Sequence, residues 1–225
     1  MRVSSHKLKA GESTVPYSLI QGHVPGPVVM VVAGIHGNER ASVRAAQQLI
    51  EHCASGLVHI QRGTLIVVPI AHRKAYKKRI RGVPDLNRTF PRKKGDAASH
   101  SASAAIFRLA QQYRPDWYLD LHEANGLSQL SKHVLGQTLI SNPGDPAVPV
   151  VKRAVRQMNR GIGHNQHRFN VRLHEKPGSS RTAMDRVLGA KTVTVETCWS
   201  LPFEQRVSWQ RKVIHFFLRE THLMM

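Results

Sequence analysis

The sequence is poor in cysteine, in acidic residues and in long apolar runs. Its two cysteines, Cys53 and Cys198, are too few for a disulfide framework or a zinc ribbon, so we expect two small buried side chains. No apolar run approaches the roughly 20 residues that cross a bilayer, and the longest, Pro27 to Ile35, has the length of a strand. The first residues, MRVSSHKLKAGEST, lack the apolar centre of a secretion signal. These absences predict a cytoplasmic protein without a membrane partner.

The shortage of acidic residues leaves a strongly basic chain. Lysine and arginine number 33 against 14 aspartates and glutamates, for a formal net charge of +19. Such a surface attracts anions, whether small acids or polyanions. The basic residues are spread along the whole chain, and no helix-turn-helix, zinc finger or aromatic RNA-binding signature accompanies them. We therefore expect the charge to favour acidic small substrates, and a nucleic acid is the less favoured partner. The residues define no oligomeric state.

Buried strands alternate with amphipathic helices along the 225 residues. Two β-branched apolar runs, 25–35 and 64–70, have the pattern of strands buried on both faces, and the helical spacing of 39–53 lies between them. This order predicts a parallel pair with a right-handed crossover. Further strands are expected at 117–121, 134–140, 169–173 and 191–197, and helices at 99–113, 146–160, 179–188 and 205–218.

The alternation predicts an α/β three-layer sandwich, with a mostly parallel mixed sheet and helices on both faces. The length suits one domain over residues 1–225. Residues 71–98 are basic and broken by glycine and proline, so we expect a long functional loop there.

The first cluster with chemical potential is Gly34-Ile35-His36-Gly37-Asn38-Glu39. It lies where a buried strand meets a helix, the edge at which open α/β sheets form sites. A histidine and a glutamate three residues apart across such a turn can reach one zinc ion, which accepts imidazole nitrogen and carboxylate oxygen. Alone, the cluster is equally typical of an ordinary helix start.

A second cluster, Asp120-Leu121-His122, ends another apolar strand and predicts a third ligand at the same sheet edge. Alternation puts Asp120 on the same side as His122, where it can orient the imidazole. Glu123 is an alternative ligand. Glu196 lies inside the β-branched run 191–197, where burying a carboxylate costs free energy and therefore indicates a function. Glu196 could act as a general base, although a structural ion pair with an arginine is the simpler interpretation.

These motifs, with Asp85-Leu86-Asn87-Arg88 between them, resemble the zinc metallocarboxypeptidase superfamily. The branch they resemble most comprises the succinylglutamate desuccinylase and aspartoacylase deacylases, and the resemblance runs from about Val31 to Trp199. It implies one zinc ion per chain and hydrolysis of an amide by activated water. The residues to which it assigns roles are His36, Glu39 and His122 as zinc ligands, Glu196 as general base, Asp85 as support of a zinc histidine, and Asn87 with Arg88 as the pair that holds a substrate carboxylate.

Two further arginine roles are implied by the resemblance. An arginine shortly before the Asp-Leu-Asn-Arg motif polarises the carbonyl, and here Arg79 and Arg81 both stand near that spacing, with Arg79 slightly favoured. The aspartoacylase branch places a substrate-carboxylate arginine about ten residues before the catalytic glutamate, where Arg186 stands. Arg186 is equally typical of the surface of a helix.

The sequence also departs from its relatives. Digestive carboxypeptidases have a tyrosine some twenty residues before the glutamate, whereas residues 169–176 contain none, leaving His174 or an arginine as a substitute. About 29 residues follow Glu196, too few for the C-terminal β-domain of aspartoacylases. We therefore expect an open pocket. Three functions stay open: a deacylase of N-acyl amino acids, a carboxypeptidase or peptidoglycan peptide amidase, and a basic, metal-free binding protein on the same fold.

Overall fold

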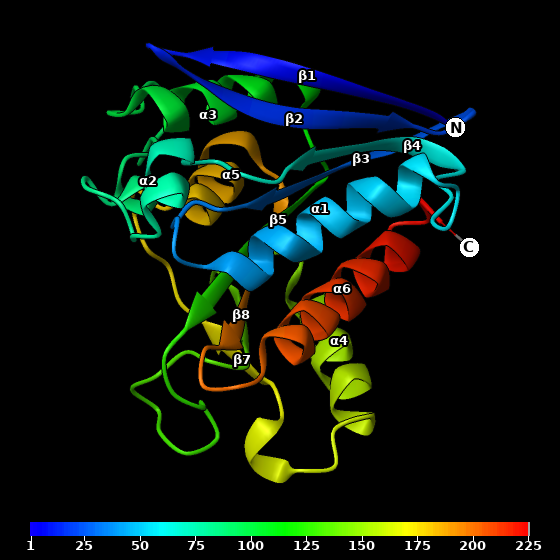
Figure 1. Cartoon of the computed structure of the whole chain (residues 1–225), viewed down its shortest axis with the longest axis vertical. Coiled ribbons are helices and arrows are strands. Elements are labelled where there is room, and N and C mark those ends of the chain that lie inside the picture. The colour runs from blue at the N-terminus through cyan, green and yellow to red at the C-terminus, as the bar shows by residue number, and fades with distance from the viewer. Residues whose placement is uncertain (225) are drawn as a thin grey trace.

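The computed structural model describes residues 1–224 and contains one eight-stranded sheet flanked by helices (Figure 1). The sheet order is β1-β2-β4-β3-β5-β8-β6-β7. The strands are β1 (Arg2–Ala10), β2 (Ser13–Gln21), β3 (Val24–Ala33), β4 (Arg62–Val68), β5 (Trp117–Ala124), β6 (Thr138–Ser141), β7 (Asn170–Leu173) and β8 (Lys191–Cys198). The helices are α1 (Arg40–Ala54), α2 (Arg73–Lys78), α3 (Ser101–Tyr113), α4 (Val148–Arg160), α5 (Ser180–Leu188) and α6 (Phe203–Glu220), with 3-10 turns η1 (Leu86–Arg88) and η2 (Asn165–His167).

The four central strands β4, β3, β5 and β8 run parallel, as the sequence predicts. Their β-branched residues are buried because helices cover both faces of the sheet. The outer strands make the sheet mixed: β2 and β6 each join the parallel centre in antiparallel orientation. The predicted fold class is confirmed.

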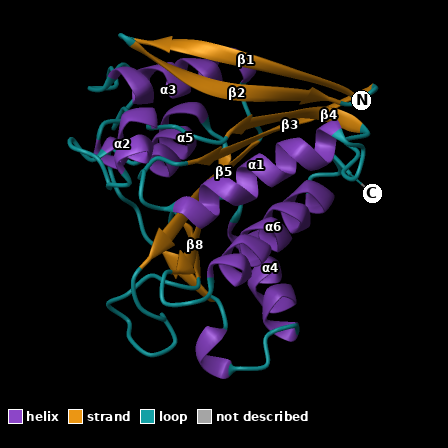
Figure 2. Cartoon of the chain, in the orientation of Figure 1, coloured by secondary structure: helices purple, strands orange, loops and turns teal. Residues whose placement is uncertain are grey.

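The helices form two groups with the sheet between them, as Figure 2 shows. Helices α1, α4 and α6 bury apolar side chains against one face, and α3 and α5 against the other. Each group has its own apolar cluster, and the alternating side chains of β3 divide between them, with Val29 and Val31 in one and Met30 and Val32 in the other. No helix among residues 1–224 is long and apolar enough to span a membrane.

Two segments differ from the sequence expectation. Residues 2–21 form the hairpin β1–β2, which the periodicity did not indicate because β1 is polar and largely exposed on both faces. Residues 71–98 are not a continuous loop, since they contain the short helix α2 and the turn η1. The sequence did not predict helix α2, because five of its six residues are polar or aromatic and only Ala75 is buried, so it has no apolar periodicity.

Candidate active site

The three expected metal ligands meet at the carboxyl ends of β3 and β5. His36 and Glu39 lie in the turn between β3 and α1, and His122 lies near the end of β5. The Nδ1 atom of His36 is 2.5 Å from Glu39 Oε1, the Nδ1 atom of His122 is 2.8 Å from Glu39 Oε2, and the two Nδ1 atoms are 3.2 Å apart. All three side chains are buried. Three ligand atoms therefore converge on one point at the sheet edge.

The outer nitrogens of both imidazoles face carboxylates. His36 Nε2 is 3.0 Å from Asp85 Oδ1, and His122 Nε2 is 3.1 Å from Asp120 Oδ2. Ser180 Oγ donates a second hydrogen bond to Asp120, at 2.5 Å. When Nε2 donates to a carboxylate, the neutral ring presents the lone pair of Nδ1, which is the arrangement typical of histidines that bind metal.

This donor set fits a zinc ion. Two imidazole lone pairs and a carboxylate directed at the same point repel one another unless a cation lies between them. Tetrahedral zinc, with bonds of about 2.0–2.2 Å, holds its ligand atoms roughly 3.3 Å apart, close to the 3.2 Å between the two Nδ1 atoms. The two nitrogen–oxygen separations, 2.5 and 2.8 Å, are shorter and would widen around an ion. Two histidines and a glutamate also leave the fourth position for water or substrate.

Glu39 is available as a ligand because another side chain caps helix α1. Glu39 occupies the N-cap position without a side-chain cap, whereas Glu123 Oε2 accepts the Ala41 N–H at 2.7 Å. The other oxygen of Glu123 pairs with Arg206. Both oxygens of Glu123, the alternative ligand, are therefore already engaged, one by the start of helix α1 and one by Arg206. Burial favours the neutral acid of Glu39, but the neighbouring His122 and His36 outweigh it and lower its pKa to about 2.

Glu196 lies beside His122 on the neighbouring strand, since the two residues are in register between β8 and β5. Its side chain is 9% exposed, and its Oε2 atom has no hydrogen-bond partner among the described residues. Burial raises the pKa of Glu196 to about 8, and the carboxylates of Glu39 and Asp120 act in the same direction, opposed by His122 and Arg81. A carboxyl group that titrates near neutrality can both accept and return a proton.

A cavity of about 410 Å³ opens beside these residues, and His36, Glu39 and Glu196 line it. Arg81, Asn87 and Arg88 line it as well. Asp85 anchors this loop: it accepts from the Asn87 N–H at 2.9 Å and from Arg81 Nη2 at 3.0 Å while it contacts His36. Although partial burial opposes it, the contacts with His36 and Arg81 lower the pKa of Asp85.

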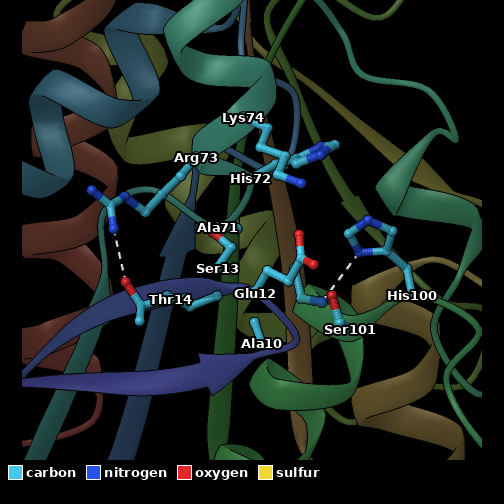
Figure 3. Close-up of a pocket in the computed structure, with 12 residues that line it drawn as sticks. Ala10, Glu12, Ser13, Thr14, Ala71, His72, Arg73, Lys74, His100 and Ser101 are labelled. Atoms are coloured by element: carbon cyan, nitrogen blue, oxygen red, sulfur yellow. Dashed lines mark hydrogen bonds between the residues drawn. The ribbon is translucent and has the colours of Figure 1, made fainter.

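A second, smaller cavity of about 110 Å³ lies between the β1–β2 turn and helices α2 and α3 (Figure 3). His72 and His100 line it with ring centroids 5.3 Å apart, and Arg73 donates to Thr14 across its edge at 2.7 Å. Among residues 1–224, the one place where three or more histidine, cysteine or acidic side chains gather at metal-binding distance is His36, Glu39 and His122. The larger cavity is therefore the candidate active site.

Comparison with protein families matches residues 25–212 to the succinylglutamate desuccinylase/aspartoacylase catalytic domain. The chain belongs to this family. The match covers most of the chain and includes every residue of the cavity wall described above. Among curated proteins, no sequence matches significantly.

Solved structures share the fold of this succinylglutamate desuccinylase/aspartoacylase family member. Carboxypeptidase A from Helicoverpa armigera is 18% identical, with a TM-score of 0.76 over 97% of this chain and 68% of that one. An aspartoacylase family protein from Mesorhizobium loti is 21% identical, with a TM-score of 0.68 over 99% of this chain and 68% of that one.

Helicobacter pylori Csd4, described as a D,L-carboxypeptidase and solved in an mDAP-bound form, is 18% identical, with a TM-score of 0.69. That alignment covers 88% of this chain and 52% of Csd4, so the chain spans about half the length of Csd4. At these identities the three likenesses establish the fold of the family member.

The structure separates the arginines to which the family resemblance assigns roles. Arg81 lines the cavity, whereas Arg79 ends helix α2 with φ of 55°, is exposed and is not part of the cavity wall. Arg186 lies outside the cavity as well: it is 38% exposed and pairs with Glu175 at 2.7 Å. Of the two interpretations of Arg186, the geometry favours the surface residue.

Several cavity residues were not among those that the motifs indicate. Arg181 is 4% exposed and lines the cavity, as do the more exposed side chains of His133, Arg172, His174 and Lys176. One signal was available for Arg181, because helical spacing places it on the same face of α5 as the buried Met184. Arg172 and His174 fall within residues 169–176, where the resemblance left His174 or an arginine as the substitute for the family tyrosine, and both line the cavity. His133 and Lys176 lie on loops, where spacing carries no such information.

Proposed function

We propose that this chain is a zinc-dependent hydrolase of amide bonds in substrates that carry a carboxylate. One observation supports this most strongly: three ligand atoms converge beside Glu196, a buried glutamate that lines the same cavity and has one oxygen without a hydrogen-bond partner among the described residues. His36, Glu39 and His122 would hold the ion. Bound there, zinc supplies a Lewis acid that makes water more acidic and polarises a carbonyl oxygen.

Glu196 performs the proton transfers. As a carboxylate it takes a proton from the attacking water, and as the acid it delivers that proton to the departing nitrogen. Its shortage of hydrogen-bond partners suits this task, because an oxygen already held by the protein would have to break that contact first. Asp85 and Asp120 keep both imidazoles oriented throughout.

Arg81 is the better placed of the two candidate arginines to stabilise the developing oxyanion. It lies in the cavity wall, is held by Asp85, and its Nη1 atom is 4.0 Å from Glu39, whereas Arg79 is outside the cavity. Asn87 and Arg88 would hold a substrate carboxylate: the Arg88 side chain is 35% exposed, and Asn87 Oδ1 is fixed by the Ser180 N–H at 2.9 Å. The Asn87 amide nitrogen, which lies 3.5 Å from His122 Nε2, still has a second hydrogen to donate toward substrate.

The substrates that suit this cavity are acidic amides. Five basic residues line it against three acids, so positive groups outnumber negative ones in its wall; the basic residues are Arg81, Arg88, Arg172, Lys176 and Arg181, and the acids are Glu39, Glu123 and Glu196. Amides of glutamate or aspartate, γ-glutamyl compounds and acidic cell-wall peptides share this chemistry. An N-acyl amino acid is the substrate type we favour, because the family is one of deacylases.

A carboxypeptidase or peptidoglycan peptide amidase is the second candidate. The structural likeness to Csd4, which was solved with bound mDAP, favours it, and a cavity of about 410 Å³ has room for more than one residue. A substrate panel separates the two functions. Faster cleavage of N-acyl amino acids supports the deacylase, and faster cleavage of short peptides with a free C-terminus supports the peptidase.

The first experiment measures metal and turnover together. We expect about one zinc ion per chain after gentle purification, and loss of amide hydrolysis on treatment with a chelator, restored by zinc. Glu196→Gln should lower kcat by roughly 100- to 10,000-fold with the zinc content unchanged. Glu204→Gln, an exposed acid on α6, is the matched control. The proposal is contradicted if hydrolysis survives metal removal or if Glu196→Gln keeps full activity. A purified protein with far less than one zinc ion per chain would instead support a metal-free binding protein.

A further inference from the structure

A basic groove lies between helices α4 and α6, which are side by side on one face of the sheet (Figure 1). Its volume is about 390 Å³, a size typical of small-molecule sites. The end of α4 forms one wall, and successive turns of α6 form the other. We call it the α4–α6 groove, after the lining side chains of Gln157, Met158, Arg211, Lys212, His215 and Arg219.

The titratable side chains that line this groove are all basic. They are Arg211, Lys212, His215 and Arg219. Among residues 1–224, none of Arg211, Lys212 and Arg219 forms an ion pair with a carboxylate. The buried Nε atom of Arg211 also has no hydrogen-bond partner there. Cations held close together without an acid repel one another, so an anion between them would lower the free energy of the folded chain.

Two of these basic groups lie below the open surface. Arg211 and His215 are half-buried, where water and salt screen charge less well than at an exposed position. Burial lowers the pKa of His215, and the charges of Arg211 and Arg219 act in the same direction. The ring is therefore neutral at pH 7 and free to donate a hydrogen bond. This arrangement differs from a solvated surface, on which basic side chains point separately into water.

The acid nearest to the groove is already paired. A hollow of about 230 Å³ adjoins the groove and shares the side chain of Arg219 with it. Glu220 lines this hollow, but its Oε2 atom is 2.5 Å from Arg153 Nη2. His222 lines the hollow as well, so the basic lining extends beyond the groove itself.

Three of the basic side chains form a row along α6. Arg211, His215 and Arg219 follow one another at intervals of four residues, which places them on one side of the helix with about 6 Å between successive positions. A row of cations suits an anion whose charges also lie in a row. The planar fork of an arginine matches the oxygens of a phosphate group, and linked phosphates carry several charges over a short length.

The walls of the groove favour a small anion over a nucleic-acid strand or a membrane. The bases of a single strand stack on exposed aromatic rings, but Phe216, the aromatic residue that lines the groove, is only 5% exposed. A membrane surface needs exposed apolar side chains beside the basic ones. Among residues 1–224, none of the large apolar side chains that are exposed lines the groove.

We propose that the α4–α6 groove binds a small anion with several linked phosphate groups, at a site separate from the active-site cavity. The two cavities share no lining residue. Gln210, on the other side of α6, donates to the His122 carbonyl at 2.7 Å, so the helix lies between the groove and the candidate metal site. The inference goes beyond the proposed function, because binding in the groove requires neither zinc nor substrate.

Calorimetric titration of the metal-free protein at about 50 mM salt tests this site. The probes are inorganic tripolyphosphate, inorganic phosphate and citrate, whose charges lie on carboxylates. We expect about one tripolyphosphate per chain, bound at least about 10-fold more tightly than phosphate or citrate. Arg211→Gln and Arg219→Gln should each weaken this binding at least about 10-fold. The matched control is Arg108→Gln, which removes the same charge from an exposed position of α3 on the opposite face of the sheet and should leave the affinity unchanged.

The other outcomes overturn the inference in distinct ways. Absent binding, or equal affinity for citrate, contradicts a phosphate site. Binding that Arg88→Gln weakens, while the groove variants do not, places the anion in the active-site cavity instead. A short oligothymidylate that binds more tightly than tripolyphosphate, and is weakened by the groove variants, assigns the groove to nucleic acid. If Arg211→Gln fails to fold, Arg219→Gln decides, because this side chain is exposed.

Discussion

At the scale of single residues, the same acid group has opposite properties at two neighbouring positions. Glu39 contacts two imidazoles, and its pKa is lowered to about 2. Glu196 is also buried, but among residues 1–224 one of its oxygens has no hydrogen-bond partner, and its pKa is raised to about 8. Local partners therefore decide which glutamate remains a permanent anion, suited to hold a cation, and which one exchanges protons.

Asp120 should tune metal binding without touching the metal. It holds His122 Nε2 at 3.1 Å, so Asp120→Asn removes the negative charge that makes this imidazole a better donor. We expect the affinity for zinc to fall roughly 10- to 100-fold in competition with a fluorescent chelator. Asp96→Asn, in the loop before α3, is the control, since Asp96 contacts only the backbone of Arg92 and Lys93. An unchanged affinity in Asp120→Asn would show that Asp120 does not support the ligand.

Glu196 should also make the metal-free protein less stable at high pH. In the folded chain its pKa is raised from 4.5 to about 8, so its contribution to stability is present below pH 4.5 and is lost as the pH rises to about 8. Glu196→Gln has no such loss. In chelator, the melting temperature of the variant relative to wild type should therefore rise between pH 5 and pH 8.5, at the edges of that window. A difference that is independent of pH contradicts the raised pKa.

At the scale of elements, the active site depends on a close contact between the β3–α1 turn and α2. A Cβ atom on Gly37 would lie 2.1 Å from the Ala75 carbonyl carbon, which is backbone and cannot move aside alone. Helix α2 therefore packs directly on the turn that carries His36 and Glu39. The loop that follows α2 brings Arg81 and Asp85 to the same turn. One glycine thus allows two segments to contribute to the candidate metal site.

Replacing this glycine should disturb both elements. We expect Gly37→Ala to lower the free energy of unfolding by roughly 1–3 kcal/mol, because the added methyl displaces the backbone of α2. Thermal or urea denaturation measures the loss. Gly163→Ala is the matched control, because a Cβ atom there meets nothing within 4 Å and its φ is not positive. Equal stability of the two variants would mean that α2 does not pack tightly on the turn.

At the scale of the whole molecule, the excess of basic residues and the cavity act in the same direction. The chain carries a net charge of +19, and several of its acids are engaged by ligand-site contacts or ion pairs. The cavity wall adds Arg81, Arg88, Arg172, Lys176 and Arg181. The proposed anionic substrate would therefore be attracted at long range and then meet local cations in the cavity.

This long-range attraction should depend on salt. Raising the sodium chloride concentration from about 20 mM to about 300 mM shortens the Debye length from roughly 20 Å to roughly 6 Å, so kcat/KM for an acidic substrate should fall several-fold. A substrate that carries glutamine in place of glutamate, with one negative charge fewer, should respond less. Steady-state kinetics at matched pH measure both. Equal salt dependence for the two substrates would show that the electrostatic field of the protein does not attract the additional carboxylate of the acidic substrate.

Much of the fold follows from local pattern. Continuous apolar runs such as 25–35 and 64–70 are typical of strands buried on both faces, and their alternation with amphipathic helices predicts the parallel centre of the sheet. The hairpin β1–β2 and helix α2 did not follow, because both bury little of their own surface and are stabilised by neighbours. A segment whose partners are distant in the chain leaves a weak periodic signal.

The sequence by itself determined which chemical groups are present and in what order: a histidine and glutamate after one buried strand, a histidine at the end of another, and Glu196 inside a third. Parallel strands bring such ends to one edge, so these positions could be anticipated. Only the tertiary structure decided between competing side chains, placing Arg81 in the cavity and Arg79 outside it, and Arg181 inside with Arg186 on the surface. The reason is physical. The turn after α2 separates Arg79 from Arg81, and five residues along α5 rotate Arg186 away from the face that carries Arg181, so neighbours in the sequence point in different directions.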